Sequence, residues 1–226
     1  MAATVTKADQ IIDAHLGGGS RGGNGFHKNG GGHSGDGGDG FHYSPARYRI
    51  GAWMAVGSIL MLFVALTSAY IVRSASSNDW RPIAMPKILW LSTALILISS
   101  VTIETARRSL KRDNNAGYAR WLANTVALGI AFVVAQLIAW RSLARQGVYL
   151  ASNPFNSFFY LFTAAHGLHL LGGLCALTYL LVRTTRKRDT LDGELRRIGA
   201  VDGAAIYWHF MDALWIGLFS LLLFWK

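Results

Sequence analysis

The chain has 226 residues, of which 52% are hydrophobic and only 15% are charged, with eight Trp and a mean hydropathy of +0.29. That charge content is low for a soluble globular domain and ordinary for a membrane protein. A formal charge of +10 would suit a nucleic-acid partner, but the Lys and Arg residues lie in short clusters between apolar runs, which is typical of membrane-topology signals, so we expect no nucleic acid.

Residues 1–46 form the first predicted region, a tail rich in glycine and histidine. Residues 17–40 are low-complexity glycine with Ser, Asn, Asp and His. Such a segment buries too little apolar surface to offset the entropy of ordering, so we predict a disordered cytoplasmic tail. The spacing of its histidines matches no known metal site, and a flexible linker is the simpler interpretation.

Residues 47–226 form the second predicted region, with five apolar runs that are each long enough to cross a bilayer. A crossing takes roughly 20 residues at 1.5 Å rise per residue. The runs cover approximately residues 50–72, 88–106, 121–140, 155–182 and 198–225. The sequence therefore predicts an all-α integral membrane protein, a bundle of five transmembrane helices. Because the connections are short, we expect consecutive helices to be antiparallel neighbours.

Most of the 22 Lys and Arg residues fall on one side of these spans, in the tail, after the second span and before the fifth. The positive-inside rule then predicts a cytoplasmic N-terminus and a C-terminus on the outer face. Trp80, Trp90, Trp140 and Trp225 cluster toward the outer boundary, as an aromatic belt would.

Glu104 lies near the inner end of the second span, and Thr93 and Ser100 share its helical stripe. Arg107 and Arg108 follow Glu104 within one turn. A near-interface ion pair with one of these arginines is the simplest interpretation of this carboxylate.

His166 and His169 lie near the middle of the fourth span, followed by Gly172 and Gly173. On a helix, His169 and Gly172 share one stripe, and His166 and Gly173 share the neighbouring one. Small residues beside imidazoles are typical of close packing inside a membrane bundle. Ionisable side chains at this depth are costly unless they face protein or water, so we expect both histidines to point into the bundle.

His209 and Asp212 share one stripe of the fifth span, at about the depth of His166, while Trp208 belongs to a second, apolar stripe. An acid and an imidazole three residues apart can share a hydrogen bond and lower each other's desolvation cost. A functional interpretation is a proton relay or a lipid head-group site. The structural interpretation, which we favour, is interhelical hydrogen bonding that fixes the packing.

We expect no haem, copper or other metal on this chain. The intramembrane histidines are accompanied by no second cluster of Cys or Met at ligand spacing, and Cys175 is the single cysteine. The sequence also shows no phosphate-binding loop, no dinucleotide fingerprint and no Ser-His-Asp arrangement at plausible depth. The residues alone therefore predict a polar seam without chemistry of its own.

Two segments, AAHGLHLLGG at residues 164–173 and YWHFMDALWIGLF at residues 207–219, resemble subunit III of haem-copper oxidases of the cytochrome c oxidase type. The first span, which ends in S-A-Y-I-V-R, is similar to a segment of the same family. The resemblance covers nearly everything from residue 47 onward, and the chain looks like the five-span bacterial form. By position, His166 and His169 match the family's H-G-L-H, while Trp208, His209 and Asp212 match its W-H-F-x-D.

The resemblance implies an accessory, non-catalytic subunit of a terminal respiratory oxidase, multi-pass in the bacterial cytoplasmic membrane. In that family, subunit III holds no redox centre, so haem and copper are expected on partner subunits. It packs directly beside subunit I, binds phospholipid between its helices, and supports stability and the access of protons or oxygen. No catalytic, cofactor or metal residue is implied here. The candidates for lipid or subunit contact in the polar seam are His166, His169, Trp208, His209, Asp212 and Glu104.

The sequence departs from the family pattern in the third span, where a Glu of the family near Gln136 is missing and residues 137–140 are apolar, and, more importantly, in the first span. The family commonly has a Glu after a Ser in the middle of the first of these spans, whereas Ile59 follows Ser58 here. Any role of that carboxylate, including pairing with the H-G-L-H imidazoles, is absent from this chain. Both departures favour a structural role over a proton antenna.

Two alternatives to an oxidase subunit stay open at this point. One is an independent transporter of protons or small solutes that uses the His and Asp seam, although the internal repeats and broken helices of transporters are not visible. The other is an assembly factor for the same oxidase, which should be substoichiometric in the finished complex.

Overall fold

The computed structural model describes residues 46–76, 87–149, 153–185 and 191–224, which form five long helices and no strand. The helices are α2 (Ala46–Ser76), α3 (Ile88–Lys111), α4 (Asn115–Arg145), α5 (Pro154–Val182) and α6 (Leu191–Phe224), with a short 3-10 helix, η1 (Arg183–Thr185), after α5. Each long helix contains a stretch that is long and apolar enough to cross a membrane. The predicted all-α, five-span membrane fold is confirmed.

Asparagine side chains determine where α4 and α5 begin. The Asn114 side chain accepts the backbone N–H of Gly117 at 2.8 Å, and the Asn153 side chain accepts that of Phe155 at 3.0 Å. Both asparagines thus satisfy donors that the start of a helix leaves without an intrahelical partner. Pro154 occupies the first turn of α5, where its missing N–H costs nothing.

The two helices α3 and α4 end with a residue in the left-handed conformation. After α4, Gly147 has φ of +76°, and the N–H groups of Gly147 and Val148 bond the carbonyls of Ala144 and Leu143, each at 3.1 Å. These paired bonds are a Schellman motif. After α3, Asp113 takes the equivalent position with φ of 57°, and the chain turns directly into α4.

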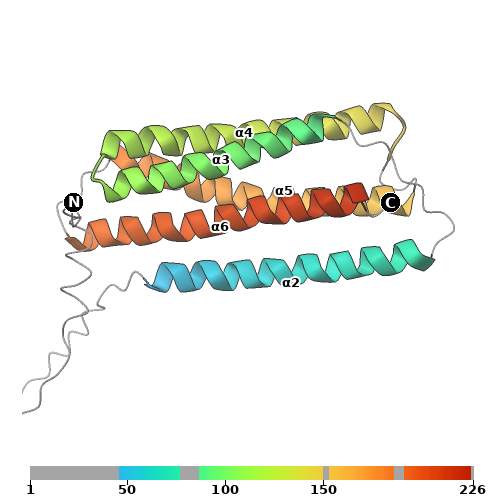
Figure 1. Cartoon of the computed structure of the whole chain (residues 1–226), viewed down its shortest axis with the longest axis horizontal. Coiled ribbons are helices and arrows are strands. Elements are labelled where there is room, and N and C mark those ends of the chain that lie inside the picture. Colours follow the sequence, from blue (N-terminus) through green and yellow to red (C-terminus); the bar gives the residue numbers. More distant parts are fainter. Residues whose placement is uncertain (1–45, 77–86, 150–152, 186–190, 225–226) are drawn as a thin grey trace, which may run out of the picture. The chain divides into compact units, whose positions relative to one another are not determined.

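Helix α6 lies at the centre of the bundle, with α2, α3 and α5 in contact with it (Figure 1). Helices α3 and α4 form the most extensively packed pair, and α5 also contacts α4 and α2. Helix α2 packs against α6 and α5 instead of α3, so the prediction that consecutive helices are neighbours is wrong for this pair. The connection from α2 to α3 is long enough in sequence for α3 to begin away from α2.

Aromatic side chains form much of the interior of the bundle. Trp208 and Trp215 of α6 are fully buried, and Phe132 of α4 meets Trp215 edge-on with 5.1 Å between ring centroids. Tyr70 of α2 is also fully buried and contacts three rings of α5, those of Phe155, Phe158 and Phe162. Such close contacts hold membrane helices together, because lipid tails are as apolar as the side chains and provide no hydrophobic driving force.

The helices extend beyond the apolar runs from which they were predicted. Helix α3 continues past residue 106 to Lys111, α4 begins at Asn115 instead of residue 121, and α6 begins at Leu191 instead of residue 198. These added turns are polar or charged, so hydropathy does not reveal them. The predicted tail lies outside the described residues except for Ala46, the first residue of α2, and Trp225 also lies outside them.

Candidate functional site

The polar seam centres on a hydrogen-bonded group shared by α3 and α6. The hydroxyl of Ser100 donates to Oδ2 of Asp212 at 2.5 Å and lies 2.8 Å from Nδ1 of His209. Because a hydroxyl has a single proton, Ser100 accepts from the imidazole while it donates to the carboxylate. Asp212 is buried, with 3% of its surface exposed, whereas His209 is exposed on the surface of the bundle.

This group agrees with one sequence-based expectation and departs from another. The spacing of His209 and Asp212 allows a direct hydrogen bond between them, but Ser100 of the other helix bridges them instead, which agrees with the favoured interpretation of interhelical bonding. No Ser-His-Asp arrangement was expected, yet these three residues meet. The order of contacts is not that of a nucleophilic triad, in which the imidazole lies between the hydroxyl and the carboxylate. Here the hydroxyl lies in the middle.

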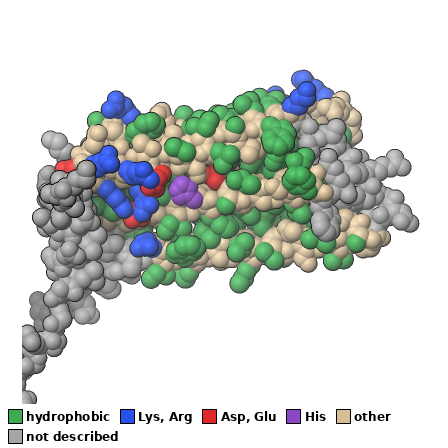
Figure 2. Space-filling view, in the orientation of Figure 1, with side chains coloured by type: hydrophobic (Ala, Val, Ile, Leu, Met, Phe, Trp, Pro, Cys, Tyr) green, Lys and Arg blue, Asp and Glu red, His purple; other side chains and the backbone are tan. Residues whose placement is uncertain are grey.

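The seam continues toward the α3–α4 turn as a cluster of ion pairs. Nε of Arg107 lies 2.5 Å from Asp202, and Nη1 of Arg107 lies 3.3 Å from Glu104. Glu104 also pairs with Arg108 at 3.1 Å, and Lys111 lies 4.0 Å from Asp202. Glu104 is therefore paired with both arginines, whereas the sequence predicted an ion pair with one of them. Figure 2 shows basic and acidic side chains gathered at this end of α3 and α6, with histidine atoms at the surface beside them.

Two buried indoles connect α6 to α3 on the core side of the seam. Nε1 of Trp208 donates to Oγ of Ser99 at 2.9 Å, and Nε1 of Trp215 donates to Oγ1 of Thr93 at 3.0 Å. Trp208 also packs against Gly129 of α4, where an added Cβ would lie 2.9 Å from the indole ring. The side chain of Trp208 therefore joins three helices.

The two histidines of α5 lie in different surroundings. His166 is 1% exposed, and its ring lies 6.0 Å from that of Phe132 and 5.2 Å from that of Trp215, measured between centroids. His169 is half-buried, and its ring meets that of Phe63 on α2 at 6.0 Å. His166 thus points into the core, and His169 points toward α2.

Of the two stripes described for the fourth span, the one that contains His166 and Gly173 faces the core. A Cβ added to Gly173 would lie 2.9 Å from the Tyr207 ring of α6, whereas one added to Gly172 would meet no atom within 4 Å. The Tyr207 hydroxyl donates to the backbone carbonyl of His169 at 2.9 Å. The two histidines of α5 therefore belong to the contacts of that helix, separate from the hydrogen-bonded group of α3 and α6.

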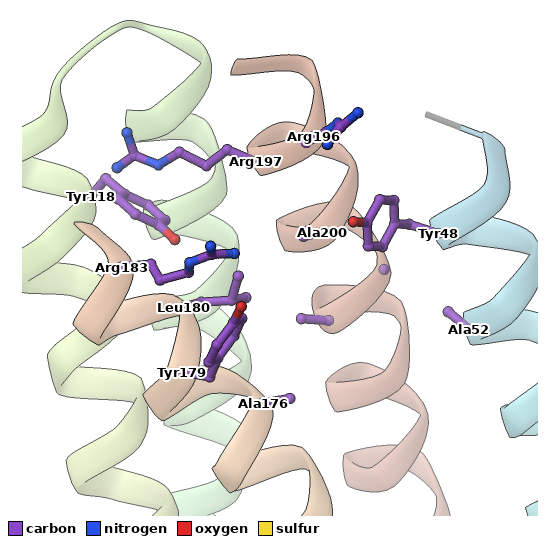
Figure 3. Close-up of a pocket in the computed structure, with 12 residues that line it drawn as sticks. Tyr48, Ala52, Tyr118, Ala176, Tyr179, Leu180, Arg183, Arg196, Arg197 and Ala200 are labelled. Carbon is purple, nitrogen blue, oxygen red and sulfur yellow. The ribbon is translucent and has the colours of Figure 1, made fainter. Parts of the chain in front are cut away.

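A cavity of about 430 Å³ lies between α2, α4, α5 and α6, at the end of the bundle where the ion pairs gather. Its walls carry three arginines and three tyrosines: Arg183, Arg196, Arg197, Tyr48, Tyr118 and Tyr179. The guanidinium of Arg197 lies over the Tyr118 ring at 4.6 Å, and that of Arg183 lies over the Tyr179 ring at 5.1 Å (Figure 3). Nη2 of Arg197 is buried and has no hydrogen-bond acceptor among the described residues. The cavity therefore offers N–H donors and positive charge to an anion.

A second, mainly apolar groove of about 700 Å³ runs between α2 and α6. Leu60, Phe63 and Val64 line it from α2, and Leu214 and Leu218 line it from α6. The cavity and the groove follow one another along the same two helices, since their α6 residues run from 196 to 204 and from 210 to 221.

Comparison with known proteins identifies the family. The model of the cytochrome c oxidase subunit III family matches residues 38–226. A probable cytochrome c oxidase subunit 3 of Nocardia farcinica is 33% identical over 184 residues, which cover 80% of this chain and 89% of that protein. The corresponding proteins of Mycobacterium bovis and Synechocystis sp. are 32% and 29% identical, and the matches cover 89% and 77% of their lengths. The chain belongs to the cytochrome c oxidase subunit III family.

Membership of the subunit III family confirms the resemblance carried by residues 164–173 and 207–219. The chain is an accessory subunit III of a haem-copper oxidase and a multi-pass membrane protein, and the transporter alternative is not favoured. Ile59, the position at which the resemblance suggested a departure from the family, is 8% exposed and packs in the core on the same face as Phe63.

Several polar side chains of this subunit III bond residues of other helices. No group of three or more His, Cys, Asp or Glu side chains that could hold a metal ion occurs within the described ranges. Ser99, Ser100 and Thr93 were missed as functional partners, although the sequence placed two of them on the stripe of Glu104. A single sequence carries no signal for the register between α3 and α6 that brings them to their partners.

We expect His166→Leu to stabilise this subunit III. Neither ring nitrogen of His166 has a hydrogen-bond partner among the described residues. A buried polar group without a partner costs about 1–3 kcal/mol, and leucine fills similar space without one. The midpoint of thermal unfolding in detergent should therefore rise, by an amount equivalent to about 1 kcal/mol.

His169→Leu is the matched control, since both histidines lie in the same motif. Nδ1 of His169 lies 2.7 Å from the carbonyl oxygen of Ala165, to which it donates, so its replacement removes a satisfied polar group and should bring no gain. A lower unfolding midpoint for His166→Leu than for the unaltered chain would show instead that His166 has a stabilising partner.

Proposed function

We propose that this chain is a structural, lipid-binding subunit that packs directly beside subunit I of a terminal oxidase in the bacterial cytoplasmic membrane. In this proposal, haem and copper are held by the partner subunits. The observation that carries it is the match of the subunit III family to residues 38–226, a range that contains all five described helices. The relatives named above are bacterial proteins, which supports the location.

A structural role is supported by the way in which polar groups are used at membrane depth. The indoles of Trp208 and Trp215 bond hydroxyls of α3, and Oγ1 of Thr102 lies 2.8 Å from Oγ1 of Thr125 on α4. Interhelical hydrogen bonds of this kind are worth about 0.6 kcal/mol each on average in a membrane protein, and they determine which faces of the helices meet. These groups hold the bundle together.

Anionic phospholipid is the ligand that suits the cavity of about 430 Å³ at the end of the bundle where the ion pairs gather, which we call the basic end. Basic pockets between transmembrane helices bind anionic head groups, and a cavity of about 430 Å³ lies within the usual range for small-ligand sites. The groove lies farther along α2 and α6 from the cavity, and its mainly apolar walls suit an acyl chain. We propose that one lipid places its phosphate near Arg183 and Arg197 and a chain along the groove.

The basic end faces the cytoplasm in this proposal. Arg107, Arg108, Lys111, Arg183 and Arg197 all lie at this end of their helices. Short segments with an excess of Lys and Arg stay on the cytoplasmic side of bacterial membranes. The lipid phosphate would then lie in the cytoplasmic leaflet.

Purification of the tagged chain in mild detergent tests the proposed function. We expect a reduced-minus-oxidised haem spectrum, about one copy of this chain per catalytic subunit, and phospholipid in the extract. A chain that is purified without any haem-containing partner would contradict the proposal. A clearly substoichiometric chain would indicate an assembly factor.

A further inference from the structure

We propose that the exposed face around His209 is the surface on which a transmembrane helix of the catalytic subunit docks, by donating a hydrogen bond to Nε2 of His209. The inference rests on the function proposed above and specifies how the partner is bound. It follows from the depth of His209, from its hydrogen bonding and from the charges around it.

His209 lies on the outside of the bundle, well inside the apolar part of the helices. Ser100, its partner on α3, is about 18 Å from the start of the apolar run at residue 88 and about 9 Å from its end at residue 106, at 1.5 Å rise per residue. The imidazole is exposed, and neither the cavity nor the groove includes it. An ionisable side chain at this depth is costly in hydrocarbon and normally faces protein or a water-filled space. A neighbouring protein that covers His209 removes this cost.

The hydrogen bonds within the seam determine which atom the neighbour meets. Ser100 donates its single proton to Asp212, so Nδ1 of His209 carries the hydrogen that Ser100 accepts. In the neutral imidazole, Nε2 is then a bare acceptor, and no described residue donates to it. The Asp212 carboxylate, which accepts from Ser100, polarises both hydrogen bonds and thereby makes Nε2 of His209 a stronger acceptor. The partner must therefore offer a donor.

The charges around the seam favour a neutral donor over a cation. Glu104 and Asp202 are already paired with Arg107, Arg108 and Lys111. Asp212 is bonded by Ser100 and is too deeply buried for a partner to reach. A hydroxyl, carboxamide or indole N–H satisfies His209 without the cost of another charge in the membrane. A second copy of this chain is a poor occupant. In a symmetric pair, Nε2 of His209 would face the same acceptor atom of the other copy, and neither copy would supply a donor.

The surroundings of His209 suit a helix that crosses the membrane. Leu97 of α3 and Ile216 of α6, which lie farther from the basic end, are 45% and 40% exposed, and Val101 is 66% exposed. Toward the basic end, the surface next to His209 is formed by the ion-pair cluster. A partner helix would thus meet apolar side chains, then one central acceptor, then charged groups near the membrane surface, which is the polarity profile of a transmembrane helix.

Photo-crosslinking tests which face is covered in the intact oxidase. We expect p-benzoylphenylalanine at Ile216 to crosslink to a haem-containing subunit. The same group at Leu161, which is 45% exposed on α5, serves as the control and should give little product. Its depth matches, since Leu161 lies about 11 Å from the start of α5 and Ile216 lies about 12 Å from the end of the antiparallel α6 at 1.5 Å rise per residue. Equal yields at both positions, or crosslinks from Ile216 only to lipid or to a second copy, would overturn the inference. Absence of any haem-containing partner for the unaltered chain would instead overturn the proposed function.

Substitutions at His209 test the acceptor itself. His209→Leu should weaken retention of this subunit after a detergent wash of the purified complex, with a roughly three- to tenfold rise in its dissociation constant. His209→Gln keeps an acceptor oxygen and should restore part of the retention. Retention of the leucine variant at the level of the unaltered subunit, with its helix content unchanged, would contradict the proposed hydrogen bond.

Discussion

Trp208→Ala is expected to lower the folding stability of this subunit by about 3–5 kcal/mol, the usual cost of truncating a large buried aromatic side chain. The indole is fully buried, bonds Ser99 on α3 and fills the space left by Gly129 on α4. Its removal leaves a cavity at the point where three helices meet and leaves the surrounding atoms without contacts. Thermal unfolding in detergent and retention in the purified complex measure the loss.

Three further variants separate the contributions of Trp208. Trp208→Phe keeps most of the ring and loses the donor, and Ser99→Ala loses the acceptor, so each should cost about 1 kcal/mol. Trp53→Ala removes the same kind of side chain from the outer face of α2, where it is 60% exposed, and should change stability little. Equal losses for Trp208→Ala and Trp53→Ala would contradict the central position of Trp208.

Gly173→Leu is expected to destabilise the chain by about 1–3 kcal/mol through overpacking, whereas Gly172→Leu should leave it unchanged or slightly more stable. Both changes bring the same gain in helix propensity, since leucine is a better helix former than glycine. At Gly173, the new side chain must displace the Tyr207 ring, which breaks the bond from Tyr207 to the carbonyl of His169. At Gly172, nothing lies within 4 Å.

Because the two glycines are adjacent in sequence, the difference between the variants isolates the packing of α5 against α6. The unfolding midpoint of the purified chain is the measurement. A larger loss for Gly172→Leu than for Gly173→Leu would mean that α5 presents the other stripe to the bundle.

Hydropathy alone predicts the number of helices and much of α6. Five apolar runs became five described helices. The apolar stripe of the fifth span to which Trp208 belongs continues at 3- and 4-residue spacing through Met211, Trp215, Leu218 and Leu222, all of which are buried, to Trp225, which lies outside the described residues. This stripe is recognisable because its large side chains alternate with polar ones on the other side of the same helix. Pattern and burial agree where the two faces of a helix differ in chemistry.

The faces of α5 could not be assigned in this way. Its outward face is apolar like its inward face, since lipid and protein interior are equally apolar surroundings. The prediction was that both His166 and His169 point into the bundle, without saying which helix each meets, and the structure directs one to the core and the other to α2. Helical periodicity gives the direction of each side chain relative to the others on the same helix. It does not specify which neighbouring helix, or lipid, lies in each direction.

The centre of the seam depends on the same missing information. Ser100 meets His209 and Asp212 only because α3 and α6 run antiparallel in a register that also brings Arg107 to Asp202. These partners are about a hundred positions apart in sequence, so no local pattern joins them. The neighbours of α2 were mispredicted for a related reason, since connection length limits which helices can be adjacent without determining which ones are.

The accessory role rests on family membership, and many of the described polar side chains suit it. They bond other helices, pair with opposite charges or line a basic cavity, and the proposed docking face adds one acceptor for a partner helix. On this account, the chain contributes shape, lipid and contact to the oxidase, while electrons and oxygen are handled by other subunits.

The most direct test of this account is the haem and copper content of the subunit after its release from the purified oxidase. Stronger detergent should dissociate the chain from the complex, and the two fractions can be assayed by absorption spectroscopy and metal analysis. We predict that all haem and copper remain with the other subunits and that the released chain is colourless. Haem or copper that stays with the released chain in stoichiometric amount would contradict the account.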